Sequence, residues 1–476
     1  MLALGIIIPI IIGCAFVHAV HRGGGLLSDR SWVVNCLFIG TGTGIGITSL
    51  LYFLWLQFLG SPGTSYIIAE VMVALCLIGF SAWTVVRAKN SRTSPGQKGS
   101  DPVPRFCRVI SAGFWGLLAL SFMGFLLASL NTPHGDWDAW AMWNLKARFL
   151  FLGGDQWRNL FSVTSDLHLD YPLLLPGFIA RCWTYVGDDP VVVPAVVAAV
   201  FTFSTVGLMY SALAVLRGRS QGFLAGIVLM GTSAFLREGA GQYADVPLGY
   251  YILLATVLVI LHGRENIQSF LALAGLAAGL AAWTKNEGVL FLAAFAVAHF
   301  TTTLYTQGIR NYFSQLMKLS YGLFPVLAVI IFFKWWYAPP SSVVLAEGAG
   351  PALEKVFQAS RHIIIIKYIL VEFISFGGLL LIFYWGLSGL RMEKAEISAI
   401  VFSIIILSIM MAGYYFIYLT TSFPLDWHLG TSLRRILLQL WPLFVFTYFL
   451  ALPSWEPATI QETSATGEKW GTGNLL

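Results

Sequence analysis

The topology of this chain depends on the course of residues 171–186, YPLLLPGFIARCWTYV. The run is apolar, but it has only 16 residues, contains two prolines and carries Arg181. A helix needs about 20 mostly apolar residues to cross a bilayer. The run is therefore either a short span or an interfacial segment. The choice sets the side of the membrane on which every later connection lies.

The composition of the chain indicates a membrane protein. Of 476 residues, 57% are hydrophobic and only 11% are charged, and the mean hydropathy is +0.75. Soluble domains carry about 25% charged residues. The composition therefore excludes a cytosolic enzyme, a disordered protein, a coiled coil and a nucleic-acid-binding domain. We predict an all-α polytopic membrane protein with about 13 transmembrane helices.

Thirteen apolar runs have the length or composition of a span. The run 32–60 is long enough to tilt, or to contain a break at GTGTGIG, residues 40–46. The runs are 2–20, 32–60, 64–86, 107–130, 190–216, 221–236, 245–262, 267–284, 287–305, 319–337, 362–386, 396–420 and 436–453.

The distribution of charge decides between the two courses of residues 171–186. If this run does not cross, one side of the membrane holds 16 Lys and Arg against 8 Asp and Glu, and the other holds 10 against 13. Cytoplasmic loops carry the excess of basic residues. A crossing would move Arg217 and Arg219 outside together with the later pattern. We therefore predict that 171–186 is interfacial, with the N-terminus outside the cell's inner (cytoplasmic) membrane and the C-terminus in the cytoplasm.

This topology leaves one long extracytoplasmic connection, residues 131–189, which we call the outer loop. On a helix, Trp137, Trp140, Asn144 and Arg148 share one side. Amphipathic helices rich in tryptophan lie flat among lipid headgroups. We predict that the outer loop forms a cap of interfacial amphipathic helices.

The same pattern divides the chain into four parts. Residues 1–87 form three accessory helices, and 88–106 form a polar cytoplasmic linker rich in Pro, Ser and Gly. Residues 107–453 form the main transmembrane domain, and 454–476 form a polar cytoplasmic tail. The five cysteines are scattered and lack CxxC spacing, so we interpret them as packing residues and not as disulfides or a zinc site.

Charged residues gather on the predicted outer side, at five separate turns. The turns are GDWDAWAMWNLKAR (135–148) with Asp136 and Asp138, HLDYP (168–172) with His168 and Asp170, REGAGQYADVP (237–247) with Asp245, WTKNEG (283–288) with Lys285 and Glu287, and WHLGTSLRR (427–435) with His428, Arg434 and Arg435.

Most of these residues also have a purely structural interpretation. Asp136 suits the N-cap of the helix that follows, and Asp138 suits the first turn because of the helix dipole. Lys285, Arg434 and Arg435 would anchor span ends among lipid phosphates.

Four further charged residues have structural alternatives of the same kind. Arg237 and Glu238 would form a surface pair. Lys367 and Glu372 lie inside one span, where charges are functional candidates. Their i,i+5 spacing does not favour a pair with each other, and a structural ion pair with other partners remains open.

Carboxylates beside cations at an outer surface suit one class of reaction. A carboxylate can act as a general base toward a hydroxyl or an amine. Nearby cations can hold a phosphate and stabilise the charge that develops as it leaves, and interfacial tryptophans can stack on a sugar. Because the sequence has no nucleotide-binding motif, the donor must already be outside. A lipid-linked phosphate ester meets this need, with its isoprenoid chain in an apolar groove between spans.

The order of these motifs resembles the GT-C class of integral-membrane glycosyltransferases over residues 107–450. The resemblance is to the protein-mannosyltransferase-like and aminoarabinose-transferase-like proteins with the rhizobial core-oligosaccharide glycosyltransferase-like domain. It rests on the acidic motif after a span, the Trp-rich outer loop, YPLLLPGF (171–178), YADVPL (243–248), GLAAGLAAWTKNEG (275–288) and TSLRRILLQLWP (431–442).

The resemblance implies a polyprenyl-phosphate-sugar donor, an inverting transfer and a periplasmic-side active site in a catalytic domain spanning 107–453. It implies that Asp138, with Asp136 beside it, is the base or a metal ligand. The GDWDAW pair has DxD spacing, whereas some relatives carry adjacent Asp-Glu. A divalent cation (Mg²⁺ or Mn²⁺) at Asp136 and Asp138 therefore stays open.

The sequence hypothesis is a glycosyltransferase in which Asp138 activates an acceptor hydroxyl. The donor phosphate binds Lys285, Arg434 and Arg435, and the other substrate-binding candidates are Asp245, His168, Asp170, Trp140, Glu287 and His428. The acceptor is a glycan, a lipid or a protein. The main alternative is a transporter or flippase for a lipid-linked sugar, using Lys367, Glu372 and broken helices. A non-catalytic membrane scaffold is the third hypothesis.

Overall fold

The computed structural model describes residues 1–21, 30–89, 105–162, 168–339, 349–389 and 394–453. Within these ranges the chain forms helices joined by turns and contains no strand, which confirms the all-α prediction. Most of the predicted linker 88–106 and the whole of the predicted tail 454–476 lie outside the described residues.

The described ranges contain 10 helices long and apolar enough to cross a membrane, or up to 12 if each of two bent pairs is one span. A multi-span membrane architecture is therefore supported, but the predicted count of thirteen is not reached. The ten are α1 (Leu2–His21), α2 (Arg30–Phe58), α3 (Thr64–Lys89), α4 (Arg105–Asn131), α7 (Val192–Leu216), α10 (Asp245–Glu265), α12 (Glu287–Gln307), α13 (Ile309–Trp336), α17 (Lys394–Thr420), and the run of α18 (Leu425–His428), η4 (Leu429–Leu433) and α19 (Arg434–Ala451).

Three predicted spans take another form. The run 267–284 becomes α11 (Ser269–Thr284), a helix of 16 residues. The run 221–236 becomes α8 (Arg219–Gly231) and α9 (Ser233–Ala240), bent by 65°. The run 362–386 becomes α15 (Ala359–Ser375) and α16 (Gly378–Ser388), bent by 69°. A helix labelled α14 (Ala349–Val356) precedes α15.

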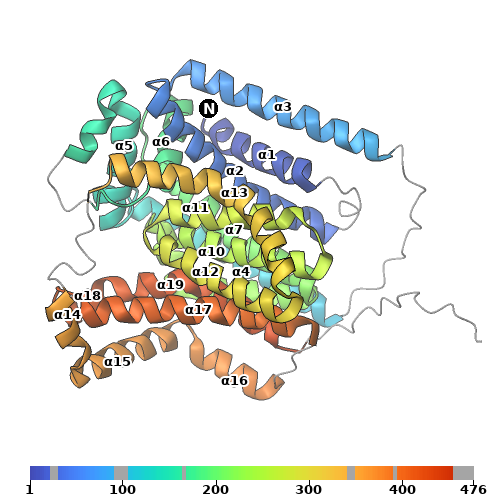
Figure 1. Ribbon diagram of the computed structural model, residues 1–476, viewed down its shortest axis with the longest axis vertical. Helices are drawn as coiled ribbons and strands as arrows, with labels where there is room; N and C mark the ends of the chain where they lie inside the picture. The colour runs from blue at the N-terminus through green and yellow to red at the C-terminus, as the bar shows by residue number, and fades with distance from the viewer. Residues whose placement is uncertain (22–29, 90–104, 163–167, 340–348, 390–393, 454–476) are drawn as a thin grey trace, which may run out of the picture.

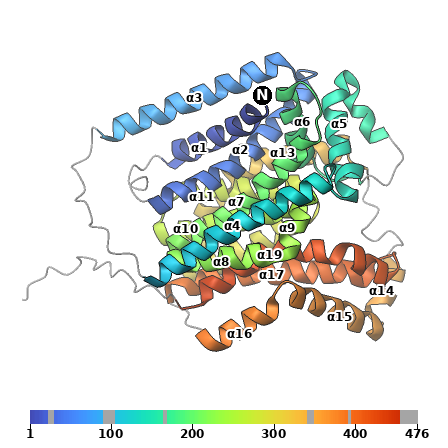
Figure 2. The ribbon, with the colours of Figure 1, turned by 180° about the vertical axis from the view of Figure 1, so that it is seen from behind.

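Helices α10 and α11 form the centre of the bundle. Their residues are apolar on every side and nearly all buried, as expected for a helix surrounded by other helices. Helix α13 packs against α11, and α7 and α19 pack against α10. Helices α1 to α3 lie at one edge of the molecule and α15 and α16 at the opposite edge (Figure 1). Seen from behind, α4 crosses the bundle over α8 and α9 (Figure 2).

The glycine-rich run 40–46 does not break α2, which is one continuous helix. Its glycines allow the close approach of α1 and α10. A Cβ on Gly44 would lie 1.8 Å from the carbonyl oxygen of Pro9 in α1, and one on Gly42 would lie 2.3 Å from the ring of Tyr250 in α10. Small residues four apart let helix backbones meet in this way. The run therefore marks a helix crossing, and the alternative of a break is wrong.

We expect Gly44→Ala to lower the stability of the protein by about 1–3 kcal/mol, because the new methyl group overpacks the crossing of α1 and α2. The matched control is Gly79→Ala in α3, where nothing lies within 4 Å of the new Cβ. The control should be neutral or slightly stabilising, since alanine favours helix over glycine. Thermal unfolding of both purified variants measures the difference, and equal unfolding temperatures would contradict the assignment of this crossing.

The outer loop lies at one end of the bundle, where it forms η2 (Ala139–Trp143), α5 (Asn144–Leu152), η3 (Gly154–Ser162) and α6 (Leu174–Val186). Trp137 and Trp140 are exposed, but Asn144 is buried, so the expected single amphipathic face is divided. Helix α6 has 13 residues, too few to cross a bilayer, and all but its last are buried between α1, α2, α5 and α7. It is thus an internal helix and does not lie flat on the surface.

Candidate functional site

The acid that we predict as the base, Asp138, lies against the second arginine of the late basic pair. The guanidinium of Arg435 donates a hydrogen bond to a carboxylate oxygen of Asp138, across 297 residues of sequence. The guanidinium also lies over the ring of Tyr243, 4.7 Å from its centroid. Both side chains are partly exposed. The pair therefore lies at the surface of the protein, where another molecule could reach it.

Local helix geometry places both partners of this pair. Asp138 precedes the π-helical turn η2, and the π-helical turn η4 ends directly before Arg434 and Arg435. π-Helical turns are rare and often occur at functional sites. No side-chain cap bond is formed by Asp138. Asp136 is held by its backbone amide, 3.1 Å from the carbonyl oxygen of Gly241, and the described residues show no N-cap bond from its side chain.

The turn 241–243 holds the start of the outer loop against α10. The side-chain amide of Asn144 donates to Gln242 at 2.9 Å, and Gln242 donates to the carbonyl of Pro133 at 3.1 Å. Gly135 has a φ of +73°, and a Cβ there would lie 2.7 Å from Gly241 O. These contacts bring Tyr243, and with it Arg435, beside Asp138.

A second group, centred on Lys285, lies deeper at the same end of the bundle. The Lys285 ammonium lies 2.9 Å from Asp245 and 2.9 Å from Glu287, and all three side chains are largely buried. Gln439 of α19 donates to Asp245 at 2.5 Å and accepts from Tyr414 at 2.5 Å. Burial disfavours the charge on Lys285, but the two carboxylates outweigh it and raise its pKa.

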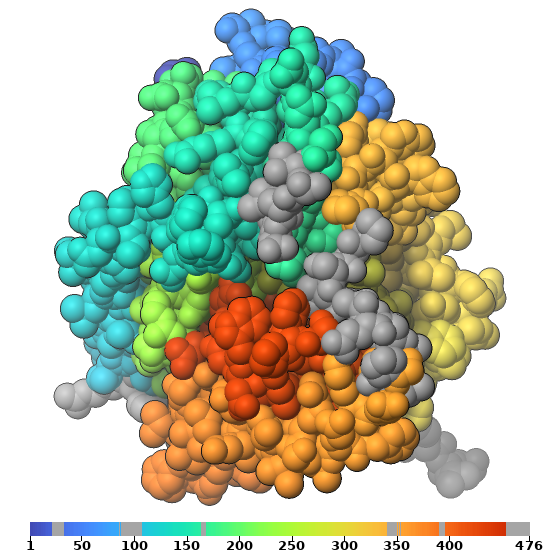
Figure 3. Space-filling view, turned by 90° about the vertical axis from the view of Figure 1, so that its left-hand side faces the viewer, coloured from blue at the N-terminus to red at the C-terminus, as the bar shows by residue number. Residues whose placement is uncertain are grey.

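The two groups are electrostatically linked. Arg435 is close enough to Asp245 for their opposite charges to attract each other. Asp245 in turn binds Lys285 directly. The convergence of Asp138, Arg435, Asp245, Lys285 and Glu287 therefore agrees with the expectation that distant outer turns meet. Figure 3 looks onto this end, where the outer loop in teal borders the C-terminal residues in red.

The segment 168–171 holds two further lysines. Lys146 of α5 donates to the carbonyl of His168 at 2.5 Å, and Lys334 of α13 donates to the carbonyl of Asp170. Lys146 is fully buried, and burial lowers its pKa to about 7, with Asp170 opposing this shift. Burial likewise lowers the pKa of His168. The ring of Tyr171 lies 5.6 Å from the Lys285 ammonium and 5.8 Å from that of Lys146.

Asn286 connects this segment to the Lys285 group. It follows Lys285 directly in the chain, donates to Asp170 at 2.6 Å and accepts from Lys334 at 2.7 Å. Among the described residues, no carboxylate lies within salt-bridge distance of Lys334 or Lys146. These two differ in this respect from the three cations predicted to bind the donor phosphate.

Three predicted residues lie apart from this convergence. Arg434 faces away from Asp138 and is held by Glu372 at 2.9 and 3.1 Å. Glu372 thus pairs with Arg434 and not with Lys367. His428 shares a hydrogen bond with Thr421 at 2.8 Å, and Trp140 packs edge-on against Trp137 at 4.6 Å. Arg237 and Glu238 form an ion pair at 3.3 Å, but Glu238 is buried, so the pair is only partly at the surface, unlike the predicted surface pair.

Four residues at this end of the bundle are not indicated as site residues by the sequence motifs. Gln439 and Asn286 are neutral, so a pattern of charged residues does not reveal them. Lys146 lies in the turn 135–148 and Lys334 inside the apolar run 319–337, and neither position by itself indicates a function. A glutamine within the apolar run RRILLQLWP (434–442) is nevertheless almost as unusual as a charge, and it was an available signal.

The residues present fit a divalent cation poorly. In the part of the chain that the structure describes, no three or more His, Cys, Asp or Glu side chains are grouped so that they could hold a metal ion. A cation at Asp136 and Asp138 would also have to displace the Arg435 guanidinium from Asp138. We therefore derive no step through a metal.

An apolar groove opens beside Lys334 on the flank of the bundle. It has a volume of about 440 Å³ and lies between the end of α11, α12 and α13. Its wall is apolar apart from Lys334, and the lining residues are Ala282, Val289, Leu292, Leu327, Ile330, Ile331, Lys334 and Trp335. The chain itself gives no match in comparisons with family models, curated proteins and solved structures.

Proposed function

We propose that this protein is a membrane glycosyltransferase that moves a sugar from a polyprenyl-phosphate donor to an acceptor on the extracytoplasmic side, with inversion. The observation that carries the proposal is the convergence of Asp138, Arg435, Asp245, Lys285 and Glu287 at one end of an apolar bundle. The resemblance of the motifs to GT-C enzymes and the adjacent apolar groove support it.

Asp138 is the proposed general base. Its carboxylate takes the proton of an acceptor hydroxyl, the hydroxyl oxygen attacks the anomeric carbon of the donor, and the bond from that carbon to the phosphate oxygen breaks. The phosphate leaves with the electron pair, and the proton passes from Asp138 to solvent. Attack opposite to the leaving group inverts the anomeric carbon. Arg435 orients Asp138 before the acceptor arrives.

The proposed donor site consists of the apolar groove and the ammonium group of Lys334 in its wall. An isoprenoid chain suits an apolar groove that is open to lipid. Lys285, Arg434 and Arg435 each already bind a carboxylate, so a phosphate would have to compete for them. Lys334 binds only a backbone carbonyl and an amide among the described residues. We therefore place the donor phosphate at Lys334, with Lys285 behind it, and assign Arg434 no donor contact.

In this proposal, four of the remaining predicted residues line the space for the sugar and acceptor. Asp245, Glu287 and Asp170 provide carboxylates for sugar hydroxyls, and His168 lies in the same segment as Asp170. Trp140 packs on Trp137 apart from these residues and has no proposed contact. His428 is held by Thr421 and has no proposed contact.

The experiment that tests the function uses the full-length protein reconstituted in liposomes with a panel of polyprenyl-phosphate sugars and membrane extracts as acceptor. We expect a glycosylated product by mass spectrometry, with the anomer opposite to that of the donor by NMR. The proposal would be contradicted if the protein neither hydrolyses nor transfers the sugar of any donor in the panel, while the same liposomes move the lipid-linked sugar across the bilayer.

One observation favours the alternative of a transporter. The two bent helix pairs meet: Thr232, at the bend between α8 and α9, accepts a hydrogen bond from Trp441 at 2.9 Å and donates to the carbonyl of Phe376, at the bend between α15 and α16, at 3.4 Å. Broken helices occur at the substrate sites of many transporters. A flippase would retain translocation when the outer loop is exchanged, whereas the enzyme would lose transfer.

We expect Lys334→Met to raise the KM for the donor by roughly 10- to 100-fold, the factor associated with losing one hydrogen bond to a charged group. Lys318→Met is the matched control, because Lys318 lies near the other end of α13 and bonds Gln268. An unchanged donor KM in Lys334→Met, with activity intact, would remove Lys334 from the donor site.

A further inference from the structure

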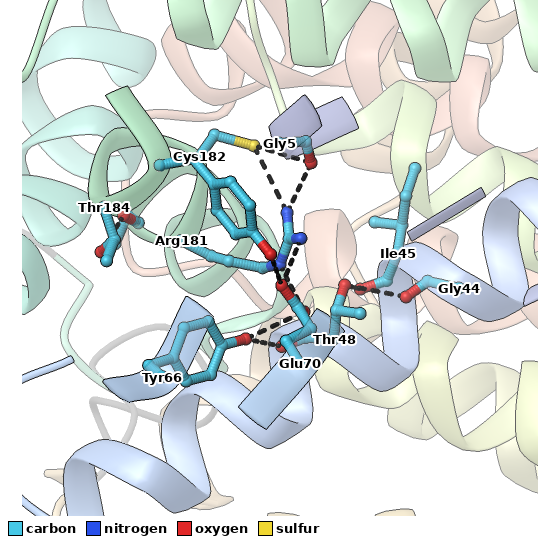
Figure 4. Close-up of polar contacts among 11 residues, drawn as sticks. Gly5, Gly44, Ile45, Thr48, Tyr66, Glu70, Arg181, Cys182 and Thr184 are labelled. Carbon is cyan, nitrogen blue, oxygen red and sulfur yellow. Dashed lines mark hydrogen bonds and ion pairs between the residues drawn. The ribbon is translucent and has the colours of Figure 1, made fainter. Parts of the chain in front are cut away.

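The N-terminal helices are joined to the bundle by an ion pair that is buried completely. Glu70 projects from α3, a helix whose other residues mostly face outward, and Arg181 projects from α6. The side chains of both residues are at most 2% exposed. The guanidinium donates to the two carboxylate oxygens of Glu70 at 2.7 and 2.6 Å (Figure 4). Two parallel bonds of this kind fix the relative orientation of the groups.

The surroundings complete the hydrogen bonding of this pair. Tyr185 donates to one oxygen of Glu70 at 2.6 Å, and Tyr66 donates to the other at 3.1 Å. The remaining nitrogen of Arg181 donates to the carbonyl of Gly5 in α1 at 2.5 Å. A buried ion pair is retained in this form only when its remaining polar atoms are also paired. The cluster thus connects α1, α3 and α6.

Helix α2 forms hydrogen bonds with both ends of α6. Ser49 donates to the carbonyl of Leu174, the first residue of α6, at 2.7 Å. Tyr52 shares a hydrogen bond of 3.1 Å with Thr184, near the last turn. Helix α6 therefore has polar anchors on all three N-terminal helices.

Helix α6 begins three residues after Tyr171, so its position sets that of the segment 168–171. This segment offers the carbonyls that bind Lys146 and Lys334, and the ring of Tyr171 lies beside Lys285. A shift of α6 would move these contacts together.

We infer that Glu70 is a positioning residue of the candidate site, and that α1 to α3 are an integral part of the site's framework. Through Arg181 and α6, Glu70 holds the segment 168–171 against the three lysines. That this region binds a substrate rests on the proposed function, but the mechanical coupling between Glu70 and Lys146 does not. It can be measured without any enzyme assay.

The experiment compares acetylation of Lys146 in the full-length wild-type protein and in Glu70→Gln, at pH 8 in nanodiscs. The Lys146 side chain is fully buried in the wild type, so access of the reagent limits its reaction. We expect labelling of Lys146, measured by mass spectrometry relative to Lys318, to rise about tenfold or more as the segment moves away.

A destabilised control separates positioning from a general loss of stability. In Gly275→Ala the new Cβ would lie 2.0 Å from the carbonyl of Leu319, at the crossing of α11 and α13. At equal unfolding temperature this variant should leave Lys146 protected. The inference is overturned if Lys146 stays protected in Glu70→Gln, or if both variants expose it equally.

A milder variant keeps the test decisive if Glu70→Gln does not fold. Tyr185→Phe removes one hydrogen bond to Glu70 and keeps the ring. We expect Lys146 labelling in Tyr185→Phe to rise about two- to fivefold, and Glu70→Asp to lie closer to the wild type than Glu70→Gln. Wild-type labelling of Lys146 in a folded Tyr185→Phe protein would also count against the coupling.

Discussion

Asp138→Asn is expected to reduce kcat for sugar transfer by about 10²- to 10⁴-fold, the usual contribution of a general base. Asparagine keeps the shape of the side chain and can still accept a hydrogen bond from Arg435, but it cannot take up a proton. The measurement is the initial rate at saturating donor and acceptor.

The fold should survive this change. Asp138 and Arg435 are partly exposed, and ion pairs of that kind contribute about 0–1 kcal/mol to stability. The unfolding temperature of Asp138→Asn should therefore stay close to that of the wild type. Asp155→Asn, at an exposed acid on the same outer loop, is the matched control and should retain full activity. A kcat for Asp138→Asn near that of the wild type would remove Asp138 from the mechanism.

Lys285→Met is expected to destabilise the protein by about 3–5 kcal/mol, because it leaves two buried carboxylates without their cation. Lys285 binds Asp245 and Glu287 at 2.9 Å each, and Gln439 alone cannot replace the charge. The prediction is checked by thermal unfolding in the same detergent as the wild type. Lys318→Met, whose partner Gln268 is neutral, should change stability little.

A combined variant isolates the cause. In Lys285→Met with Asp245→Asn and Glu287→Gln, no carboxylate remains to be neutralised, so we expect most of the lost stability to return. If the single variant unfolds at the wild-type temperature, the three residues do not form the buried group described above. If the triple variant is no more stable than the single one, the loss arises from packing and not from charge.

The architecture was predictable from sequence to the extent that it depends on composition. Long apolar runs must form helices in a membrane because their backbone polar groups have no other partners. The run 40–46 was harder, because glycines suggest a break in a soluble helix but a close crossing between membrane helices. The neighbours that decide between these, Pro9 and Tyr250, are distant in sequence.

The candidate site was predictable in its membership more than in its pairing. Successive spans return the chain to the same side of the bundle, so acids and bases at alternate turns gather at one end. This argument brought Asp138, Asp245 and Lys285 into one group. It could not show that Lys285 is already bound by two acids, since contact depends on the direction and length of each side chain.

By itself, then, the sequence determined that this protein is a bundle of apolar helices with few charges, and that acids and bases from several separate turns return to the same end of the bundle. Only the tertiary structure decided which charges meet. Arg434 and Arg435 are neighbours in the chain, yet one binds Glu372 and the other Asp138. The physical reason is that a helix turns by about 100° per residue, so adjacent side chains face different neighbours, and packing alone determines who those neighbours are.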